Sequence, residues 1–355
     1  MRLEARRGGV VVVGGSAGSH PALLSLVAGL PADLPAAVLV VIHIGAQASS
    51  RLPQILSRAG SLPAAHAADG APLRNGEIVV APPDRHLLVE DGSIRLGSGP
   101  RVNRVRPAVD VLFASAARAA GPLVTAVQLS GMLDDGAVGA ALVSGTGGQV
   151  LVQAPDEAPH GSKPRAALAA APGAVAVPAP KLATAVLQAI GRTAAAPHEE
   201  IHEIQRRNAV MKMADSSDPG FLTGNETKLT RLACPECGGV LAEISLPSIT
   251  YFHCHVGHQY APQTLAAAQA ETSEAKLWAV VAALEEQTVV LRHLAGQGPA
   301  VSTGTAGGEA DGEPGDQPGG RPRDKQRAEQ ARKARETTEL ADTIRTHLQR
   351  SRDAG

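Results

Sequence analysis

The chain has 355 residues, of which 44% are hydrophobic and only 2% aromatic, and its formal net charge is -1. This length allows one large α/β core with a smaller module, and Ala, Val and Leu must form most of that core. The balanced charge argues against a nucleic-acid partner. Charges precede the first apolar run and glycines interrupt it. We therefore expect no signal peptide, no membrane span and a cytoplasmic location.

The first predicted strand ends in a glycine-flanked serine. Residues 10–13 are four valines, Ser16 follows in a glycine-rich turn, and a helical pattern covers residues 20–30. Such a turn lifts the serine out of the sheet and brings backbone amides close to a bound group. Two interpretations are open at this point: Ser16 is a nucleophile, or the turn binds phosphate or is merely tight. A dinucleotide-binding loop is disfavoured, because Ser16 stands where that loop requires a glycine.

Short apolar runs alternate with helical patterns up to about residue 195. The pattern predicts strands over residues 10–13, 37–42, 77–81, 86–89, 125–129 and 149–153, and helices near residues 20–30, 48–59, 108–120, 135–145 and 180–191. This alternation predicts an α/β fold with a doubly wound, mostly parallel sheet and helices on both faces. In such folds the site lies outside the carboxyl ends of the strands.

Two further strand ends carry a histidine and an acidic turn. The second predicted strand is followed by His43, and a later one leads into Asp134 and Asp135. Because parallel strands share one carboxyl edge, Ser16, His43 and an aspartate can lie together there. An imidazole activates a serine hydroxyl by removing its proton, and a carboxylate fixes the imidazole tautomer and stabilises its charged form. The combination favours a nucleophilic serine over a structural turn.

Five blocks between residues 9 and 192 carry a resemblance to a known family. They read GGSAGS at 14–19, VIH at 41–43, APPDRH at 81–86, VNRVRP at 102–107 with DVLF at 110–113, and SGMLDDGA at 130–137. In order and spacing these blocks resemble the CheB-type chemotaxis receptor methylesterase (protein-glutamate methylesterase) catalytic domain. The α/β-hydrolase elbow is a weaker match, since that fold needs several strands before its nucleophile and a late histidine, for which only His160 is available.

The resemblance implies a serine hydrolase whose triad falls on Ser16, His43 and the second aspartate, Asp135. The family hydrolyses glutamyl methyl esters on chemoreceptors, and some members deamidate glutamines there. No catalytic cofactor is implied. The partners implied are a methylated chemoreceptor or receptor-like protein and the cognate receptor methyltransferase. Met132 falls where the family has a methionine lining the site, and Asp134 is expected to lie outside the chemistry.

The chain departs from the family pattern close to the predicted nucleophile. Ala17 and Ser19 stand where the family has Thr and Gly, and Leu133 stands where it has Gly. Backbone donors around Ala17 and Gly18 remain available for an oxyanion. The family commonly has an N-terminal receiver domain, and because the first predicted strand begins near residue 9 we expect that control to be absent. The alternative function is a non-catalytic or weakly active signalling and docking module.

All three cysteines occur in one short C-terminal segment. Cys234 and Cys237 form a C-x-x-C pair, and Cys254 is followed four residues later by His258. Zinc favours four thiolate or imidazole ligands, and a small segment with almost no core needs such a tie to fold. His253 and His255 compete with His258 for the fourth position, and the spacing favours His258. The alternative is three reduced cysteines without metal.

A closed site of four ligands has no open position for water, so the predicted zinc is structural. A similar zinc-ribbon-like tail is found on some stand-alone methylesterases of the family. We expect this tail to fold independently and to leave small-ester chemistry in the first 195 residues unchanged. The predicted organisation is a catalytic domain at 1–195, a linker helix at 196–221, a zinc-ribbon-like module at 222–262, a helix at 263–295, a disordered linker at 296–324 and a charged helix at 325–355.

Overall fold

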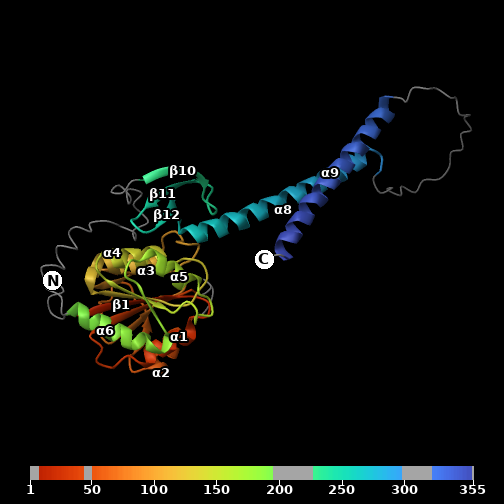
Figure 1. Ribbon diagram of the computed structural model, residues 1–355. Coiled ribbons are helices and arrows are strands. Elements are labelled where there is room, and N and C mark those ends of the chain that lie inside the picture. The colour runs from red at the N-terminus through yellow and green to blue at the C-terminus, as the bar shows by residue number, and fades with distance from the viewer. Residues whose placement is uncertain (1–7, 44–49, 195–226, 298–321, 354–355) are drawn as a thin grey trace, which may run out of the picture. The chain divides into compact units, whose positions relative to one another are not determined.

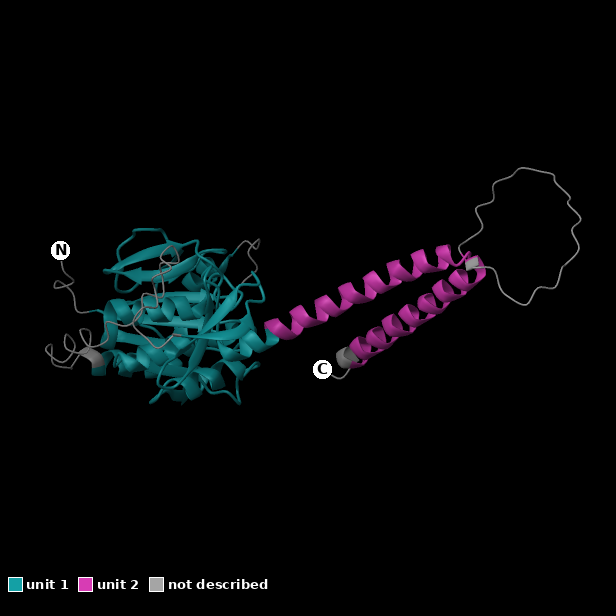
Figure 2. Ribbon diagram, turned by 90° about the horizontal axis from the view of Figure 1, so that it is seen from above, with its two compact units in different colours: residues 1–267 teal, residues 268–355 magenta. Residues whose placement is uncertain are grey.

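The computed structural model describes residues 8–43, 50–194, 227–297 and 322–353. These residues fall into two compact units, 1–267 and 268–355, whose boundary lies within a long helix (Figure 2). The predicted linker helix at 196–221 lies outside the described residues, as does nearly all of the predicted disordered linker at 296–324. The predicted domain boundaries therefore stay predictions.

A seven-stranded sheet forms the centre of the first unit. Its strands run in the order β3-β4-β2-β1-β7-β8-β9, and every neighbouring pair is parallel. The strands are β1 (Gly9–Gly15), β2 (Ala36–Ile42), β3 (Ala64–His66), β4 (Ile78–Val80), β7 (Val124–Gln128), β8 (Gln149–Gln153) and β9 (Val175–Val177). The chain builds outward from β1 on one side and then continues on the other, so the topological switch point lies beside β1.

Helices cover both faces of this sheet, which confirms the predicted doubly wound fold (Figure 1). Val11 and Val13 of β1 belong to a buried cluster with one set of helices, and Val10 and Val12 to a cluster with the other set. The first set is α1 (His20–Ala28), α2 (Leu52–Ala59) and α6 (Leu182–Ala194), and the second is α3 (Val109–Ala120), α4 (Ala137–Gly145) and α5 (Ser162–Ala170). Alternate valines thus face opposite layers, because successive side chains of a strand point to opposite faces.

One predicted strand does not join the central sheet. β5 (His86–Glu90) pairs with β6 (Ser93–Gly97) in a separate antiparallel hairpin. The short strands β3 and β9 and helix α5 escape the sequence pattern, since three-residue strands and an alanine-rich helix give little periodicity. Two short 3₁₀ helices, η1 (Gly121–Leu123) and η2 (Ala179–Lys181), complete the described connections.

The Cys/His segment forms a second, antiparallel sheet in the same unit. Its strands are β10 (Thr227–Ala233), β11 (Val240–Ser245), β12 (Thr250–Cys254) and β13 (Gln259–Tyr260), paired in chain order. Buried Ile244 and Tyr251 pack against Ala114 of α3 and Val138 of α4. Figure 1 shows β10–β12 on the side of the central sheet that α3 and α4 cover. This small sheet therefore packs on the doubly wound domain through apolar side chains.

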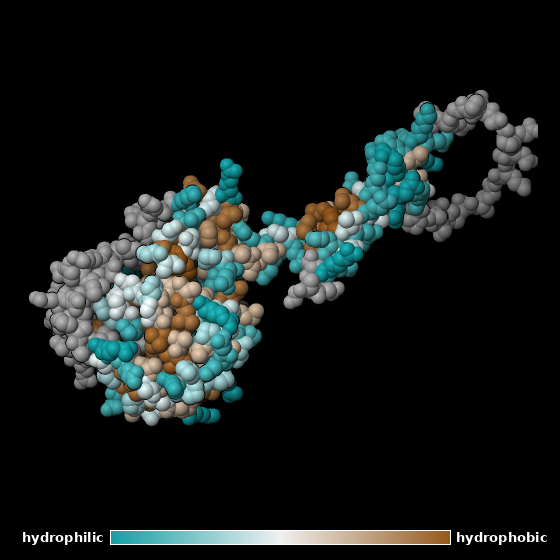
Figure 3. Space-filling view, in the orientation of Figure 1, coloured by the Kyte–Doolittle hydropathy of each residue, from teal (hydrophilic) through white to brown (hydrophobic). Residues whose placement is uncertain are grey.

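The second unit is a pair of antiparallel helices. α8 (Pro262–Leu294) begins in the first unit, and α9 (Pro322–Asp353) returns alongside it. Thr288 and Thr337 share a hydrogen bond of 2.8 Å, and Arg345 bonds to Glu285. Figure 3 shows a brown, apolar patch on this pair of helices. Exposed apolar side chains of the two helices include Val280, Val289, Val290, Leu294 and Leu340. Within the described ranges, every helix is too short or too polar to cross a membrane.

Close packing between α3 and α4 predicts a sharp difference between two glycines of α4. A Cβ on Gly139 would lie 2.5 Å from Cβ of Phe113, whereas a Cβ on Gly145 would meet nothing within 4 Å. We expect Gly139→Ala to destabilise the protein by about 3 kcal/mol through overpacking. Gly145→Ala should raise the free energy of unfolding by up to about 1 kcal/mol, because alanine favours the helix more than glycine does. Chemical denaturation followed by circular dichroism measures both, and equal stabilities would contradict this packing.

Candidate active site

Ser16 lies in the tight turn that follows β1. Its backbone N–H donates to the Ser130 carbonyl at 2.9 Å, and the Ser19 hydroxyl donates to the Ser16 carbonyl at 2.6 Å. Gly18 has φ +75°, and a Cβ there would lie 2.7 Å from Cβ of Pro159. The turn therefore needs glycine at this position, and its contacts hold Ser16 against the loop that follows β7.

His43 and Asp135 form a buried hydrogen-bonded pair. Gly15 of β1 pairs with Ile42 of β2, so the next residues, Ser16 and His43, follow neighbouring strand ends. The His43 Nε2–H donates to Oδ2 of Asp135 at 2.7 Å, and the side chains are 15% and 3% exposed. This arrangement leaves Nδ1 of His43 free to accept a proton. The side chains of Ser16 and His43, both among the described residues, make no hydrogen bond to each other. Catalytic hydrogen bonds of this kind are often long without substrate and tighten when it binds.

The Asp135 carboxylate sits among donors from three parts of the chain. Its Oδ1 accepts from Nδ2 of Asn103 at 2.9 Å, and its Oδ2 accepts from the Val109 amide at 2.8 Å. The Asp110 amide also donates to it, at 3.3 Å. Both amides belong to the first turn of α3, where the helix dipole favours an anion. The site thus holds a carboxylate that remains charged although it is buried.

Lys163 supplies the compensating positive charge. Its Nζ donates to the Asp135 carbonyl at 2.8 Å and lies 3.6 Å from Oδ2, and its side chain is 1% exposed. Burial alone would raise the pKa of Asp135, but Lys163, His43 and Asn103 together hold that pKa below its usual range. Sequence reasoning missed Lys163. The sequence of α5, SKPRAALAA, contains both Lys163 and Arg165, and its pattern does not indicate that Lys163 is the buried one.

A second buried carboxyl lies directly behind Asp135. Asp110 is 1% exposed and accepts from the Gly139 amide and from Nδ2 of Asn103, both at 2.7 Å. Burial, with the neighbouring Asp135 carboxylate, raises the pKa of Asp110 to about 8. Asn103 therefore bridges two carboxyl groups. Both residues occur in the quoted sequence blocks, yet nothing in the pattern indicates that they contact the acidic turn.

Backbone donors and exposed apolar groups surround the predicted nucleophile. The amides of Ala17 and Gly18 donate no hydrogen bond within the described residues, so both can face an oxyanion. Met132 is 60% exposed on the loop after β7. Leu133 has φ +60°, a left-handed conformation that costs a non-glycine residue about 1 kcal/mol. This backbone conformation explains why glycine suits position 133.

Asp134 has a role that the sequence did not indicate. Its carboxylate accepts from the Gln263 and Thr264 amides at 2.6 and 3.0 Å, and from the Thr264 hydroxyl at 2.6 Å. It therefore caps the N-terminus of α8, 130 residues further along the chain. A buried carboxylate at a helix N-terminus stabilises that helix, so Asp134 contributes to the fold. Its expected place outside the chemistry stays a prediction.

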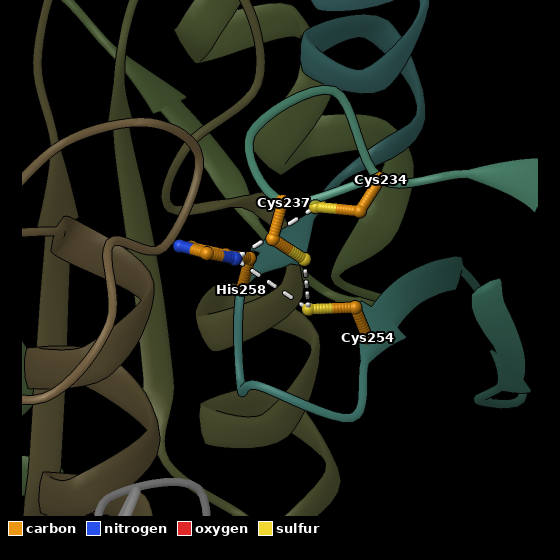
Figure 4. A group of neighbouring side chains, drawn as sticks. All are labelled: Cys234, Cys237, Cys254 and His258. Atoms are coloured by element: carbon orange, nitrogen blue, oxygen red, sulfur yellow. Dashed lines mark hydrogen bonds between the residues drawn. The ribbon is translucent and has the colours of Figure 1, made fainter. Parts of the chain in front are cut away.

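Three cysteines and one histidine converge in the small antiparallel sheet (Figure 4). The sulfurs of Cys234, Cys237 and Cys254 and Nδ1 of His258 all lie within 4.8 Å of one another. Cys237 and Cys254 have their sulfurs 3.6 Å apart, and Nδ1 of His258 is 3.5 Å from the Cys254 sulfur. Zn–S bonds of about 2.3 Å in a tetrahedron place two sulfurs about 3.8 Å apart. The group could hold a metal ion of this kind.

Outer contacts orient these four side chains. Nε2 of His258 lies 3.5 Å from Glu236, whose other oxygen accepts from the Tyr260 hydroxyl at 2.9 Å. Such partners fix the tautomer of a metal-binding histidine. His253 instead has its Nδ1 against the Cys254 carbonyl, and His255 lies against Gly239, outside the group of four. The structure thus brings His258, rather than either competitor, to the three sulfurs.

The fold and the side chains together define a doubly wound α/β domain with a serine, a histidine and a charged buried aspartate at its switch point. Residues 11–186 match the family model described as CheB methylesterase. These residues therefore form a CheB methylesterase domain.

Curated relatives agree with this assignment. Protein-glutamate methylesterase/protein-glutamine glutaminase 2 of Anaeromyxobacter dehalogenans (strain 2CP-C) is 41% identical over 155 residues, which are 44% of this chain and 45% of that protein. Protein-glutamate methylesterase/protein-glutamine glutaminase 4 of Myxococcus xanthus (strain DK1622) is 43% identical over 148 residues, 41% of this chain and 42% of that protein. The chain therefore matches less than half of the length of these two relatives.

The crystal structure of the Thermotoga maritima CheB methylesterase catalytic domain is 29% identical in sequence. The match covers 51% of this chain and 98% of the Thermotoga maritima chain, with a TM-score of 0.48.

The charges around His43 predict a measurable pKa change. Burial lowers the pKa of His43 first, and the Lys163 ammonium lowers it further, against the raising effect of Asp135. Neutral His43 therefore persists to lower pH than an exposed histidine does. In Lys163→Met the pKa of His43 should rise, because a cation that disfavours the imidazolium is gone. An NMR titration of the ring measures this, with exposed Lys181→Met as the control, and an unchanged or lower pKa in Lys163→Met would contradict the geometry.

Proposed function

We propose that the chain is a serine hydrolase that demethylates glutamyl methyl esters on chemoreceptors or receptor-like signalling proteins. The observation that carries the proposal is the charged, buried Asp135 bonded to His43 at 2.7 Å, beside Ser16 at the strand edge. The CheB methylesterase match over residues 11–186 supports this reaction class, as do relatives named protein-glutamate methylesterase/protein-glutamine glutaminase.

In the proposed reaction the Ser16 hydroxyl attacks the ester carbonyl while Nδ1 of His43 takes its proton. Asp135 stabilises the imidazolium through Nε2. The amides of Ala17 and Gly18 stabilise the oxyanion, and His43 returns the proton to the departing methanol. Water then attacks the acyl carbonyl while His43 accepts its proton. The ester bond to Ser16 breaks, His43 returns the proton to the Ser16 oxygen, and glutamate is released. A glutamine side chain would react in the same way with ammonia as leaving group.

Exposed groups beside the site support a protein substrate. Met132 is 60% and Leu133 is 36% exposed, so two apolar side chains stand at the surface next to Asp134 and Asp135. A receptor helix presenting a methylated glutamate could pack on them. The proposed partners are this receptor and, further, the cognate methyltransferase, in the cytoplasm. No cofactor takes part in the proposed chemistry.

The same proposal assigns a structural zinc to Cys234, Cys237, Cys254 and His258. Their donor atoms lie within 4.8 Å of one another, and they make a complete four-ligand set with no position for water. When bound, zinc would tie β10–β11 to β12–β13. The four proposed ligands belong to the small antiparallel sheet and its turns, whereas Ser16 and His43 follow strands of the parallel sheet. Zinc held by these ligands would therefore have a structural role and take no part in the reaction at Ser16.

Replacement of the nucleophile tests the reaction class. Ser16→Ala should lower kcat for a small ester and for a methylated receptor preparation by on the order of 10³-fold or more, because the covalent step is lost. Ser25→Ala, on the exposed face of α1, is the matched control and should keep full activity. Methanol release and chromogenic ester hydrolysis measure both. Near-normal hydrolysis by Ser16→Ala would sink the assignment, and no hydrolysis by the unsubstituted chain would favour the docking-module alternative.

Metal analysis tests the proposed zinc site. Freshly purified, reduced protein should contain one zinc per chain, and Cys237→Ser should contain far less, because a four-ligand site loses one thiolate. Glu236→Gln should retain zinc but bind it about 10-fold to 100-fold more weakly, since it loses the charge that orients His258. Elemental analysis and competition with a chromogenic chelator give these values. Metal-free protein at isolation would overturn the zinc assignment.

A further inference from the structure

Asn103 joins the Cys/His module to the proposed triad. Its backbone N–H donates to the Gln259 carbonyl at 2.7 Å, and its Oδ1 accepts from the Ala261 amide at 2.7 Å. The other end of the same side chain, Nδ2, donates to Asp110 and to Asp135. Asn103 is 4% exposed and its φ is +52°, a conformation that asparagine tolerates better than most residues. The buried side-chain amide of Asn103 thus contacts both the Cys/His module and the Asp135 carboxylate.

The contact points on the module lie next to the metal-ligand cluster. Gln259 directly follows His258, and Ala261 is three residues beyond it. Cys254 and His258 are tied to each other through the bond from the Cys254 amide to the His258 carbonyl, 3.0 Å. The conformation of the loop from Cys254 to His258 therefore determines the positions of the Gln259 carbonyl and the Ala261 amide that bond to Asn103.

A second anchor holds the residue directly before Asp135. Asp134 caps the first turn of α8 through Gln263 and Thr264, which follow Ala261 in the chain. The loop that carries Asp135 is thus fixed through Asp134 to the first turn of α8, directly after the module in the chain, and the Asp135 carboxylate is fixed to the module through Asn103. Loss of the module would remove the Asn103 anchor, leave the start of α8 without its preceding support, and open Asn103 to water.

We infer that the metal-bound Cys/His module positions the Asp135 carboxylate through Asn103, so that metal occupancy controls the chemical step itself and not only receptor binding. This inference rests on the proposed function of Ser16, His43 and Asp135. Asn103 is a positioning residue: it touches no substrate and acts through Asp135 and His43. The inference replaces the expectation that the module is independent of small-ester chemistry.

Chelation of zinc from the full chain tests this coupling. Removal of zinc should lower kcat for a small chromogenic ester by about 100-fold, as expected for loss of precise alignment, with KM changed much less. Added zinc should restore kcat. Hydrolysis of the small ester that is unaffected by complete zinc removal would overturn the inference.

Asn103→Ala separates positioning from general loss of structure. This variant should retain one zinc per chain yet lose kcat by about as much as chelation does. Chelation of the Asn103→Ala variant should then lower its kcat by a further factor of less than about three, because the effects of coupled sites are not additive. Asn75→Ala, which removes an exposed asparagine of the same unit, should keep full activity and the full loss on chelation. Additive losses in Asn103→Ala would overturn a route through Asn103.

A readout other than activity keeps the two proposals apart. The hydrogen-bonded Nε2–H of His43 should give a strongly deshielded NMR resonance in zinc-loaded protein, and chelation or Asn103→Ala should broaden it or move it upfield. If neither chelation nor Asn103→Ala changes this resonance, the coupling is contradicted, whatever the activity is. If the resonance responds but the unsubstituted chain hydrolyses no ester, the proposed function fails while the coupling stands.

Discussion

The buried charge of Asp135 is the constraint around which this domain is organised. Burying a lone carboxylate costs several kcal/mol, and its neighbours must offset that cost. His43 follows β2, Asn103 belongs to the loop before α3, the Val109 amide opens α3, and Lys163 lies in α5. Elements from both halves of the doubly wound fold therefore converge on one side chain, and the strand edge with Ser16 is positioned as a consequence.

The same constraint shapes the second layer of the site. With Asp135 charged, the adjacent Asp110 is the carboxyl whose pKa rises, to about 8. Two carboxyls in one buried pocket cannot both ionise freely, so their pKa values move apart. Asn103 donates to both carboxyl groups, so its position affects both of them. The Cys/His module closes this pocket through the Ala261 amide.

The module itself shows how a small sheet can reach such a position. Both tyrosines of the chain lie in it, and Tyr251 and Tyr260 are each 1% exposed. Tyr251 packs toward α3 and α4, and Tyr260 packs on the ligand cluster. Few other large apolar groups are available, so the zinc that we propose here would supply much of the stability of this segment. The same metal would then hold the contacts that the segment makes with Asn103.

The sequence by itself determined the local elements and the edge at which chemistry can occur. Valine runs predict β1 and β2, and parallel strands share one carboxyl edge, so the pattern alone groups Ser16, His43 and the acidic turn. The spacing of Cys234, Cys237, Cys254 and His258 likewise follows local rules for metal ligands.

Only the tertiary structure decided which distant groups meet. The Asn103 contact with Ala261 spans 158 residues, and Asp134 meets Thr264 across 130. Two further contacts also join separate segments of the chain: β5 pairs with β6, and Lys163 approaches Asp135. Periodicity and motif spacing report on neighbours along the chain. Burial of charge is satisfied by whichever donors the packed fold brings within hydrogen-bond distance, and no local pattern encodes that.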